Sequence, residues 1–384
     1  MTLRILISYI ALLGTGSLSV AAHPLPTLSW AELAFQLPAG AKSIRYLNGK
    51  FTLAGGQPWY IGQSPGSAYI ATSSDGLNWD VFSPLEHFDV LSDSAYGNGR
   101  YVVTGDDGGV FVSNDGITWT SHRIANTLHD LDTVAFGAGR FVAFARNRNL
   151  IYTSLDGETW ETVDTSNTSF VDRVSFLNDH FVAVGEGGTL LFSADGLTWS
   201  EKNVDPANII SSGKSLFSAE YGKGRYVVGG YFFTAYSTDG ETWHPQEAPF
   251  QVQSLQYSDG WFVAFGNTPQ YMTSRDGAHW SVYPNINNEW DFRATQHNGQ
   301  WIGVAGSKVY GAVSSSNSHP FTLSLLGTNE VEVFQEVGTT YTLWKSFDLT
   351  NWSQIDVRSG GGDFFTWPLG IDSGAAVFYR ATKD

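Results

Sequence analysis

Six near-copies of one heptapeptide divide most of this 384-residue chain into units of almost constant length. Each copy begins with Ser, contains an adjacent Asp-Gly pair and ends in Trp: SSDGLNW (73–79), SNDGITW (113–119), SLDGETW (154–160), SADGLTW (193–199), STDGETW (237–243) and SRDGAHW (274–280). Successive copies end 40, 41, 39, 44 and 37 residues apart. A fixed period in this range predicts a repeat architecture in which each unit stacks on its neighbours.

Each unit is predicted to contain four short β-strands. In one unit, LDTVAF (131–136) and RFVAF (140–144) flank a Gly-Ala-Gly turn, LIYT (150–153) follows, and a fourth strand surrounds Trp160. Short strands with Gly-rich turns at regular spacing indicate an all-β fold. Four strands per 40 residues are typical of a β-propeller blade.

The repeat count predicts seven blades over residues 23–313. After Trp280, residues 291–306 and 308–313 supply three more strands, and neither a heptapeptide nor a fourth strand follows them. The segment SWAELAF (29–35) is typical of the fourth strand of a blade, but the first three strands of that blade do not precede it. We therefore expect this N-terminal strand to complete blade 7 and close the ring, which removes the exposed sheet edges of an open array. Six and eight blades are the alternatives.

The heptapeptide resembles the Asp-box, or BNR repeat, of sialidases and related propellers, and the resemblance covers about residues 40–313. It departs from the usual pattern because Asp and Gly are adjacent, as in Asp75-Gly76. The Asp side chain suits turn amides, the Gly suits a positive φ, and the Trp suits packing between blades. In Asp-box propellers these turns lie on the outer rim, so we expect a structural role without metal binding.

The two ends of the chain are predicted to lie outside the propeller. Residues 1–22 have the pattern of a signal peptide, with a basic start, an apolar core and a cleavage site after Ala22. A linker-like stretch, 314–320, precedes residues 321–384, whose alternating runs predict a small C-terminal β-sandwich. This part resembles domains that end secreted proteins of environmental bacteria. We expect a secreted, periplasmic or cell-surface location.

Composition excludes several classes of partner. The net charge of −16 disfavours nucleic acid and anionic membranes. The chain has no Cys, so an exported form has no disulfides and depends on its core, for which 14 Trp, 17 Tyr and 25 Phe are available. No metal motif, cofactor motif or membrane-spanning stretch is found in the sequence, and we expect a monomer.

Propeller topology places candidate site residues on the face opposite the heptapeptide turns, where interblade loops and the loops between second and third strands meet. The candidates for binding a ligand are Arg146, Arg148, Arg173, Arg293, Trp59, Tyr60 and Trp290. The candidates for catalysis are His129, Asp132, Asp172 and Tyr231. Arginine forks suit carboxylates or sulfates, and exposed rings suit sugars. The alternative is that Arg173 and Arg293 form structural interblade ion pairs with Asp132, Asp172 or Asp291.

These residues support two main hypotheses. The first is a non-catalytic propeller that binds a glycan or protein ligand at its channel face. The alternative is a carbohydrate-active enzyme, a polysaccharide lyase or glycoside hydrolase, acting on an acidic polysaccharide. A third hypothesis is an assembly factor. A true sialidase is disfavoured, because its Arg-Ile-Pro motif is missing and Ser43-Ile44-Arg45-Tyr46 is the nearest approach.

Overall fold

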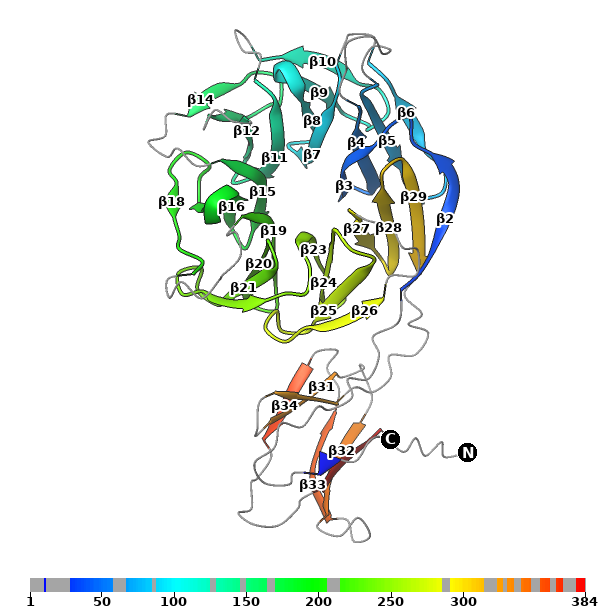
Figure 1. Cartoon of the computed structure of the whole chain (residues 1–384), viewed down its shortest axis with the longest axis vertical. Helices are drawn as coiled ribbons and strands as arrows, with labels where there is room; N and C mark the ends of the chain where they lie inside the picture. The colour runs from blue at the N-terminus through cyan, green and yellow to red at the C-terminus, as the bar shows by residue number, and fades with distance from the viewer. Residues whose placement is uncertain are drawn as a thin grey trace. The chain divides into compact units, whose positions relative to one another are not determined.

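A computed structural model of the chain shows the predicted ring of seven four-stranded antiparallel blades (Figure 1). It describes residues 10–11, 28–57, 67–84, 88–124, 129–145, 150–163, 170–205, 215–284, 291–313, 323–326, 330–334, 340–346, 353–359, 364–368 and 378–383. Residues 28–314 form one compact unit.

The first two strands of each blade form its inner half. The innermost strands, which surround the channel, are β3 (Ala41–Leu47), β7 (Leu91–Gly97), β11 (Leu131–Gly137), β15 (Val171–Leu177), β19 (Leu216–Gly222), β23 (Val252–Ser258) and β27 (Arg293–His297). The second strands are β4 (Lys50–Gly55), β8 (Arg100–Gly105), β12 (Arg140–Ala145), β16 (His180–Gly185), β20 (Arg225–Gly230), β24 (Trp261–Gly266) and β28 (Gln300–Ala305).

The outer half of each blade contains a third strand and an edge strand. The third strands are β5 (Tyr69–Ser73), β9 (Gly109–Ser113), β13 (Ile151–Ser154), β17 (Leu190–Ser193), β21 (Phe233–Ser237), β25 (Gln270–Ser274) and β29 (Lys308–Val313). The outermost strands are β6 (Asp80–Phe82), β10 (Thr120–Arg123), β14 (Glu161–Val163), β18 (Ser200–Glu201), β22 (His244–Glu247), β26 (Ser281–Pro284) and β2 (Ser29–Gln36). Two short 3₁₀ turns follow the second strands of blades 2 and 4, η1 (Asp106–Gly108) and η2 (Glu186–Gly188).

The N-terminal strand closes the ring as predicted. Strand β2 pairs antiparallel with β29, with Ser29 opposite Val313 and Trp30 opposite Ala312. Trp30 is 5% exposed and packs edge-on against Phe292. Blade 7 therefore joins the two ends of the propeller sequence, and β29 is paired on both of its edges, by β28 and by β2.

Each inner hairpin turns through two residues with positive φ. In blade 1 these are Asn48 (φ 41°) and Gly49 (φ 85°), and in blade 2 Asn98 (φ 48°) and Gly99 (φ 79°). This pair of left-handed residues matches the right-handed twist of the strands that it joins. The recurring Gly-x-Gly turn is thus a hairpin signal.

Glycine at the end of an inner strand allows neighbouring blades to approach closely. A Cβ atom built on Gly137 would lie 2.0 Å from the ring of Phe176 in the next blade. The same contact recurs between Gly97 and Phe136. Between blades 7 and 1, where His297 replaces the glycine, its ring stacks on Tyr46 with centroids 3.8 Å apart. At each of these interfaces, an aromatic side chain of one blade therefore packs against the last residue of the inner strand in the preceding blade.

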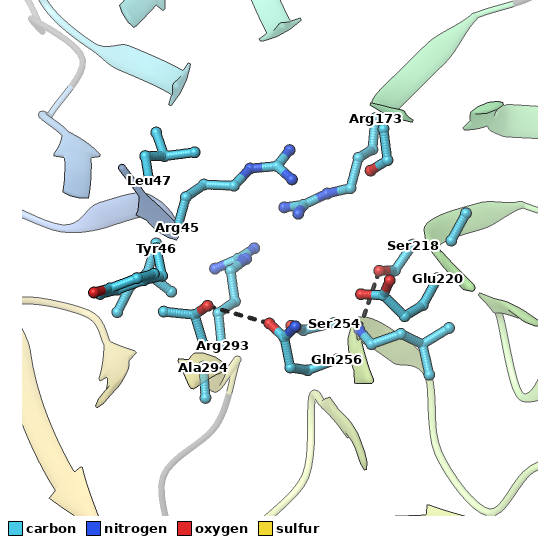
Figure 2. Close-up of a pocket in the computed structure, with 15 residues that line it drawn as sticks. Arg45, Tyr46, Leu47, Arg173, Ser218, Glu220, Ser254, Gln256, Arg293 and Ala294 are labelled. Carbon is cyan, nitrogen blue, oxygen red and sulfur yellow. Dashed lines mark hydrogen bonds between the residues drawn. The ribbon is translucent and has the colours of Figure 1, made fainter. Parts of the chain in front are cut away.

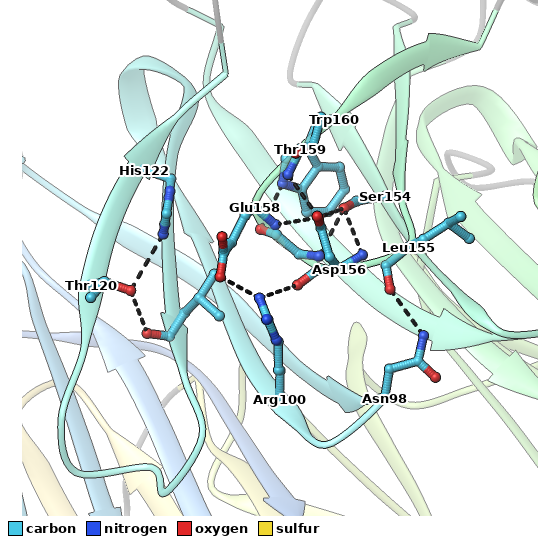
Figure 3. Close-up of polar contacts among 12 residues, drawn as sticks. Asn98, Arg100, Thr120, His122, Ser154, Leu155, Asp156, Glu158, Thr159 and Trp160 are labelled. Carbon is cyan, nitrogen blue, oxygen red and sulfur yellow. Dashed lines mark hydrogen bonds and ion pairs between the residues drawn. The ribbon is translucent and has the colours of Figure 1, made fainter.

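The heptapeptide is a hydrogen-bonded turn between the third and fourth strands, as predicted (Figure 3). In blade 3, Ser154 Oγ donates to Asp156 Oδ1 at 3.0 Å and accepts from Gly157 N at 2.8 Å. Asp156 Oδ1 also accepts from Glu158 N and Thr159 N, both at 2.8 Å. Trp160 Nε1 donates to Gly157 O at 2.9 Å. The Asp carboxylate is thus used within its own turn.

The second compact unit contains residues 1–27 and 315–384. Its described strands form two antiparallel sheets: β1 (Ile10–Ala11), β35 (Phe378–Lys383), β32 (Thr340–Ser346) and β33 (Ser353–Ser359) in one, and β30 (Leu323–Leu326), β31 (Glu330–Phe334) and β34 (Phe364–Pro368) in the other. The change in composition after 313 therefore coincides with a division of the chain. Cleavage after Ala22 and the sandwich arrangement stay predictions.

Candidate functional site in the channel

The inner strands place one polar residue per blade at the same height in the channel. Each of these residues lies opposite the fifth residue of its neighbouring second strand, as Asp93 lies opposite Thr104 and Arg173 opposite Val184. We call the seven residues the polar ring: Ser43, Asp93, Thr133, Arg173, Ser218, Ser254 and Arg293.

Three oxygen-bearing residues of the polar ring, Asp93, Thr133 and Ser218, each accept a backbone hydrogen bond from the next blade. Thr133 Oγ1 accepts a hydrogen bond from Val174 N at 3.0 Å, and Ser218 Oγ accepts one from Leu255 N at 3.0 Å. A guanidinium has no acceptor atom, so arginine cannot make this contact. At Arg173 and Arg293 the ring therefore has a cationic side chain in place of an interblade acceptor.

A third arginine reaches the polar ring from blade 1. Arg45 donates to Asp93 through Nε at 3.0 Å and through Nη2 at 2.7 Å. Thr133 Oγ1 also donates to Asp93 Oδ2, at 2.9 Å. Burial by itself raises the pKa of Asp93, but the charge and hydrogen bonds of Arg45 outweigh it and the pKa is lowered. Arg45 and Asp93 therefore neutralise one another.

Two cavities meet at the remaining arginines. The mouth cavity, of about 520 Å³, opens where the inner strands begin and includes Lys42, Asp132 and Asp172 in its lining. The inner cavity, of about 200 Å³, is lined further along these strands by residues including Arg45, Glu220 and Gln256. Arg173 and Arg293 line both cavities. Figure 2 shows the side chains of Arg45, Arg173 and Arg293 extending toward the same space.

Arg173 and Arg293 are buried cations without a directly bonded anionic partner among the described residues. Removal from water lowers the pKa of Arg173 to about 10, assisted by repulsion from Arg45 and Arg293, despite attraction to Asp93 and Glu220. Burial likewise lowers the pKa of Arg293, although the charge of Asp291 opposes the shift. Among the described residues, neither side chain forms a hydrogen bond or ion pair. The alternative of structural ion pairs with Asp132, Asp172 or Asp291 is therefore not found in the described part of the chain.

Glu220 faces the same inner cavity from β19. Its Oε1 accepts a hydrogen bond from Tyr221 N at 3.1 Å. Burial raises the pKa of Glu220 to about 7, although the backbone hydrogen bonds and the charges of Arg45 and Arg173 oppose the shift. The carboxyl group therefore changes its charge near neutral pH.

The mouth cavity is acidic on one side. Its lining contains seven aspartates against Lys42, Arg173 and Arg293: Asp89, Asp93, Asp106, Asp107, Asp130, Asp132 and Asp172. Burial raises the pKa of Asp106 to about 6, with Asp89 and Asp130 adding repulsion and two backbone hydrogen bonds opposing it. No group of three or more acidic, His or Cys side chains suited to a metal ion occurs among the described residues.

The structure brings some of the predicted site residues together and separates others. Arg173, Arg293, Asp132 and Asp172 all line the mouth cavity. His129 instead contacts the hydroxyl of Tyr152, with Nδ1 and Oη 3.1 Å apart, and lines neither cavity. Tyr231 is 41% exposed on the loop between β20 and β21 and also lies outside both linings. The predicted residues Arg146, Arg148, Trp59, Tyr60 and Trp290 lie outside the described residues.

Sequence reasoning missed Arg45 and Glu220 as members of the site. Both occupy the inner-strand position two residues after the polar ring, opposite Thr52 and Val227 respectively. Alternate residues of a strand face the same side, so this position shares the channel with the polar ring. Alignment of the blades on their hairpin turns reveals both charges, whereas the spacing of the heptapeptides alone does not.

The fold and the site together define a seven-bladed β-propeller with a charged, partly enclosed channel. Within the described residues, no helix is long and apolar enough to span a membrane. No protein-family model matches the chain, and no curated protein matches its sequence. Assignment to the Asp-box or sialidase-like group therefore stays a prediction.

Several solved structures share the propeller fold. A catalytically inactive virginiamycin B lyase from Staphylococcus aureus, solved with quinupristin, superposes with a TM-score of 0.63 at 10% identity, covering 75% of this chain and 99% of that one. YCF48 bound to D1 peptide gives 0.60 at 16% identity over 79% and 100%. The WD40 propeller of Doa1 gives 0.55 at 10% identity over 75% and 98%. At these identities the similarity establishes the fold alone.

Proposed function

We propose that this chain is a non-catalytic binding propeller that takes an anionic group of its ligand into the channel. The observation that carries this proposal is the guanidinium of Arg173, which lies at the junction of the two cavities without an ion pair among the described residues. A desolvated charge costs free energy unless a partner compensates it. A ligand carboxylate, bound bidentately by Arg173 or Arg293, supplies that compensation.

The charge of the mouth favours a protein segment over an acidic polysaccharide. With Asp93 paired to Arg45, six aspartates and three cationic side chains remain among the described residues that line the mouth cavity, so a polyanion meets net repulsion there. A peptide brings a single carboxylate to the arginines and its own donors to the aspartates. One of the similar propellers, YCF48, was solved with a bound peptide, the D1 peptide, which supports this choice of ligand. A neutral glycan with one acidic end group is the other ligand of this kind.

The remaining features of the proposal come from sequence. The apolar N-terminal segment ending at Ala22 supports export, and the heptapeptide turns support kinship with Asp-box propellers. Together they suggest a monomeric exported binding protein, whose C-terminal unit serves attachment or sorting.

The test is a selection of displayed peptides on the purified chain, run in parallel with a glycan array. Arg173→Gln provides the counter-selection, because it keeps the side chain polar and removes the positive charge. We expect ligands that bind the unmodified chain and lose at least tenfold in affinity with Arg173→Gln. Ligands that bind both forms equally would place binding elsewhere on the propeller.

A second candidate function is supported by one observation. Glu220, with its pKa near 7, shares the inner cavity with Arg173, and a carboxyl group tuned to neutral pH suits proton transfer beside a bound carboxylate. An arginine that neutralises a uronate, beside a group that can move its α-proton, is the arrangement that a polysaccharide lyase needs. Mass spectrometry of products after incubation with acidic and neutral polysaccharides distinguishes this enzyme from a binding protein.

A further inference from the structure

Glu220 is a carboxyl group of the inner cavity that no arginine engages through a hydrogen bond among the described residues. The cavity receives Arg45 from β3, Arg173 from β15 and Arg293 from β27. Arg45 donates to the carboxylate of Asp93, from Nε at 3.0 Å and from Nη2 at 2.7 Å. Glu220 accepts hydrogen bonds from the backbone instead, from Tyr221 N and from the amide of Tyr257. Figure 2 shows it beside Ser218, across the cavity from Arg45.

The other described groups that line this cavity carry no negative charge. Strand β23 contributes Ser254 and Gln256, and β27 adds Thr295 to the lining. From β3, the lining includes the hydroxyl-bearing ring of Tyr46, on which His297 of β27 stacks. A ligand anion in this cavity therefore meets two arginines that have no bonded carboxylate among the described residues, and one carboxyl group whose charge depends on pH.

We infer that the inner cavity binds its anion together with a proton, and that Glu220 holds this proton. The inference rests on the proposed function, since it requires an anion at Arg173. Ionised Glu220 repels an incoming carboxylate and competes with it for Arg173. Protonated Glu220 has no net charge and presents one O–H donor, which the ligand carboxylate can accept. The proton comes from solvent, so binding converts Glu220 carboxylate, a proton and the anion into a neutral carboxyl group hydrogen-bonded to the anion.

The direction of the pH dependence follows from linkage. Burial places the pKa of Glu220 at about 7 in the empty cavity, so the neutral form is already abundant near neutrality. A bound anion raises this pKa further, and by reciprocity protonation strengthens anion binding. Below the pKa of the empty state, affinity is insensitive to Glu220. Above it, affinity falls by up to about tenfold per pH unit until the pKa of the complex is reached.

The experiment titrates the full chain with sodium acetate at constant ionic strength from pH 6 to 9, using NMR shifts of the protein to measure the dissociation constant. We expect the constant to rise at least fivefold over this range for the unmodified chain. In Glu220→Gln, which stays neutral, we expect a nearly constant value close to the low-pH value of the unmodified chain. A parallel ¹³C titration of labelled glutamate carboxyl groups should show the Glu220 pKa rising when acetate is added.

Two control variants test whether the pH dependence belongs to Glu220. Glu201→Gln removes a carboxyl group from the exposed strand β18 and should keep the pH dependence. His297→Gln removes the histidine that stacks on Tyr46 and should also keep it. Equal slopes in the unmodified chain and Glu220→Gln would overturn the inference, while Arg173-dependent acetate binding would leave the proposed function intact. Acetate binding that is absent, or equally strong in Arg173→Gln, would overturn both.

Discussion

Arg45 of blade 1 donates two hydrogen bonds to the carboxylate of Asp93 in blade 2, at 3.0 and 2.7 Å. Asp93 is 2% exposed, and it also accepts hydrogen bonds from Thr133 Oγ1 and Val134 N in blade 3. One carboxylate therefore connects three consecutive blades at the wall of the channel. Because this pair is internally neutral, Arg173 and Arg293 are the arginines of the inner cavity that have no bonded carboxylate among the described residues.

Removal of the Asp93 carboxylate should strongly destabilise the propeller. Asp93→Ala leaves Arg45 as an unpaired cation in the channel and leaves Thr133 without its acceptor, at a cost of about 3–5 kcal/mol of unfolding free energy. Urea denaturation measures this loss. The double variant Arg45→Met/Asp93→Ala should lose less than the sum of the two single variants, and additive losses would contradict the coupling.

Acid should weaken the same connection. The folded-state pKa of Asp93 lies below its ordinary value, so its contribution to stability is present above the unfolded-state pKa of about 3.9 and is lost as pH falls through the folded value. Asp93→Asn, measured beside the unmodified chain between pH 7 and pH 3, should show a smaller loss of stability on acidification. Parallel curves for the two proteins would show that Asp93 does not contribute to acid unfolding.

Replacement of Arg173 should stabilise the empty propeller while weakening ligand binding at least tenfold. Its pKa, lowered to about 10, shows that the fold disfavours the charged form that prevails at neutral pH. Arg173→Met keeps much of the length of the side chain and removes the charge, so we expect a gain of about 0.5–2 kcal/mol in unfolding free energy. Differential scanning calorimetry without ligand measures it. A large loss of stability would instead indicate that Arg173 is a structural residue.

A single methyl group should disturb the interface between blades 3 and 4. In Gly137→Ala the new Cβ would lie 2.0 Å from the Phe176 ring, which predicts an overpacking cost of about 1–3 kcal/mol. Combination with Phe176→Leu should recover part of this cost. Gly40→Ala is the matched control, because no atom lies within 4 Å of its added Cβ, and it should be nearly neutral. Equal thermal stabilities of the Gly137→Ala and Gly40→Ala proteins would contradict the packing argument.

The heptapeptide turns should act as independent local supports. Asp156→Ala removes the acceptor of Glu158 N and Thr159 N, and by analogy with lost helix caps we expect a cost of about 1 kcal/mol. Burial by itself raises the pKa of Asp156, but these hydrogen bonds outweigh it and the pKa is lowered. Ligand affinity should stay unchanged, since the turn lies outside both cavity linings. A loss of ligand affinity, measured beside the change in stability, would show that the heptapeptide turns take part in binding.

Much of the architecture could be predicted because its signals are local. The heptapeptide pattern, which includes Asp75 and Trp79, is contained in seven consecutive residues. The pair Asn98-Gly99 likewise forms a hairpin turn by its own positive φ angles. The site could be predicted only in part. Topology placed Arg173, Arg293, Asp132 and Asp172 at the mouth, and it also suggested His129 and Tyr231, which do not line either of the two cavities.

The sequence by itself determined the number of blades, their hairpin turns and the closing strand, because the chemistry of each of these features is contained in about 40 neighbouring residues or in a terminal strand. Only the tertiary structure decided which charges share the channel. Arg45 and Arg293 come from blades at opposite ends of the propeller sequence, and ring closure makes those blades neighbours. Whether an arginine is neutralised depends on distances across the channel, as the Arg45–Asp93 pair shows, and no periodic pattern along the chain contains those distances.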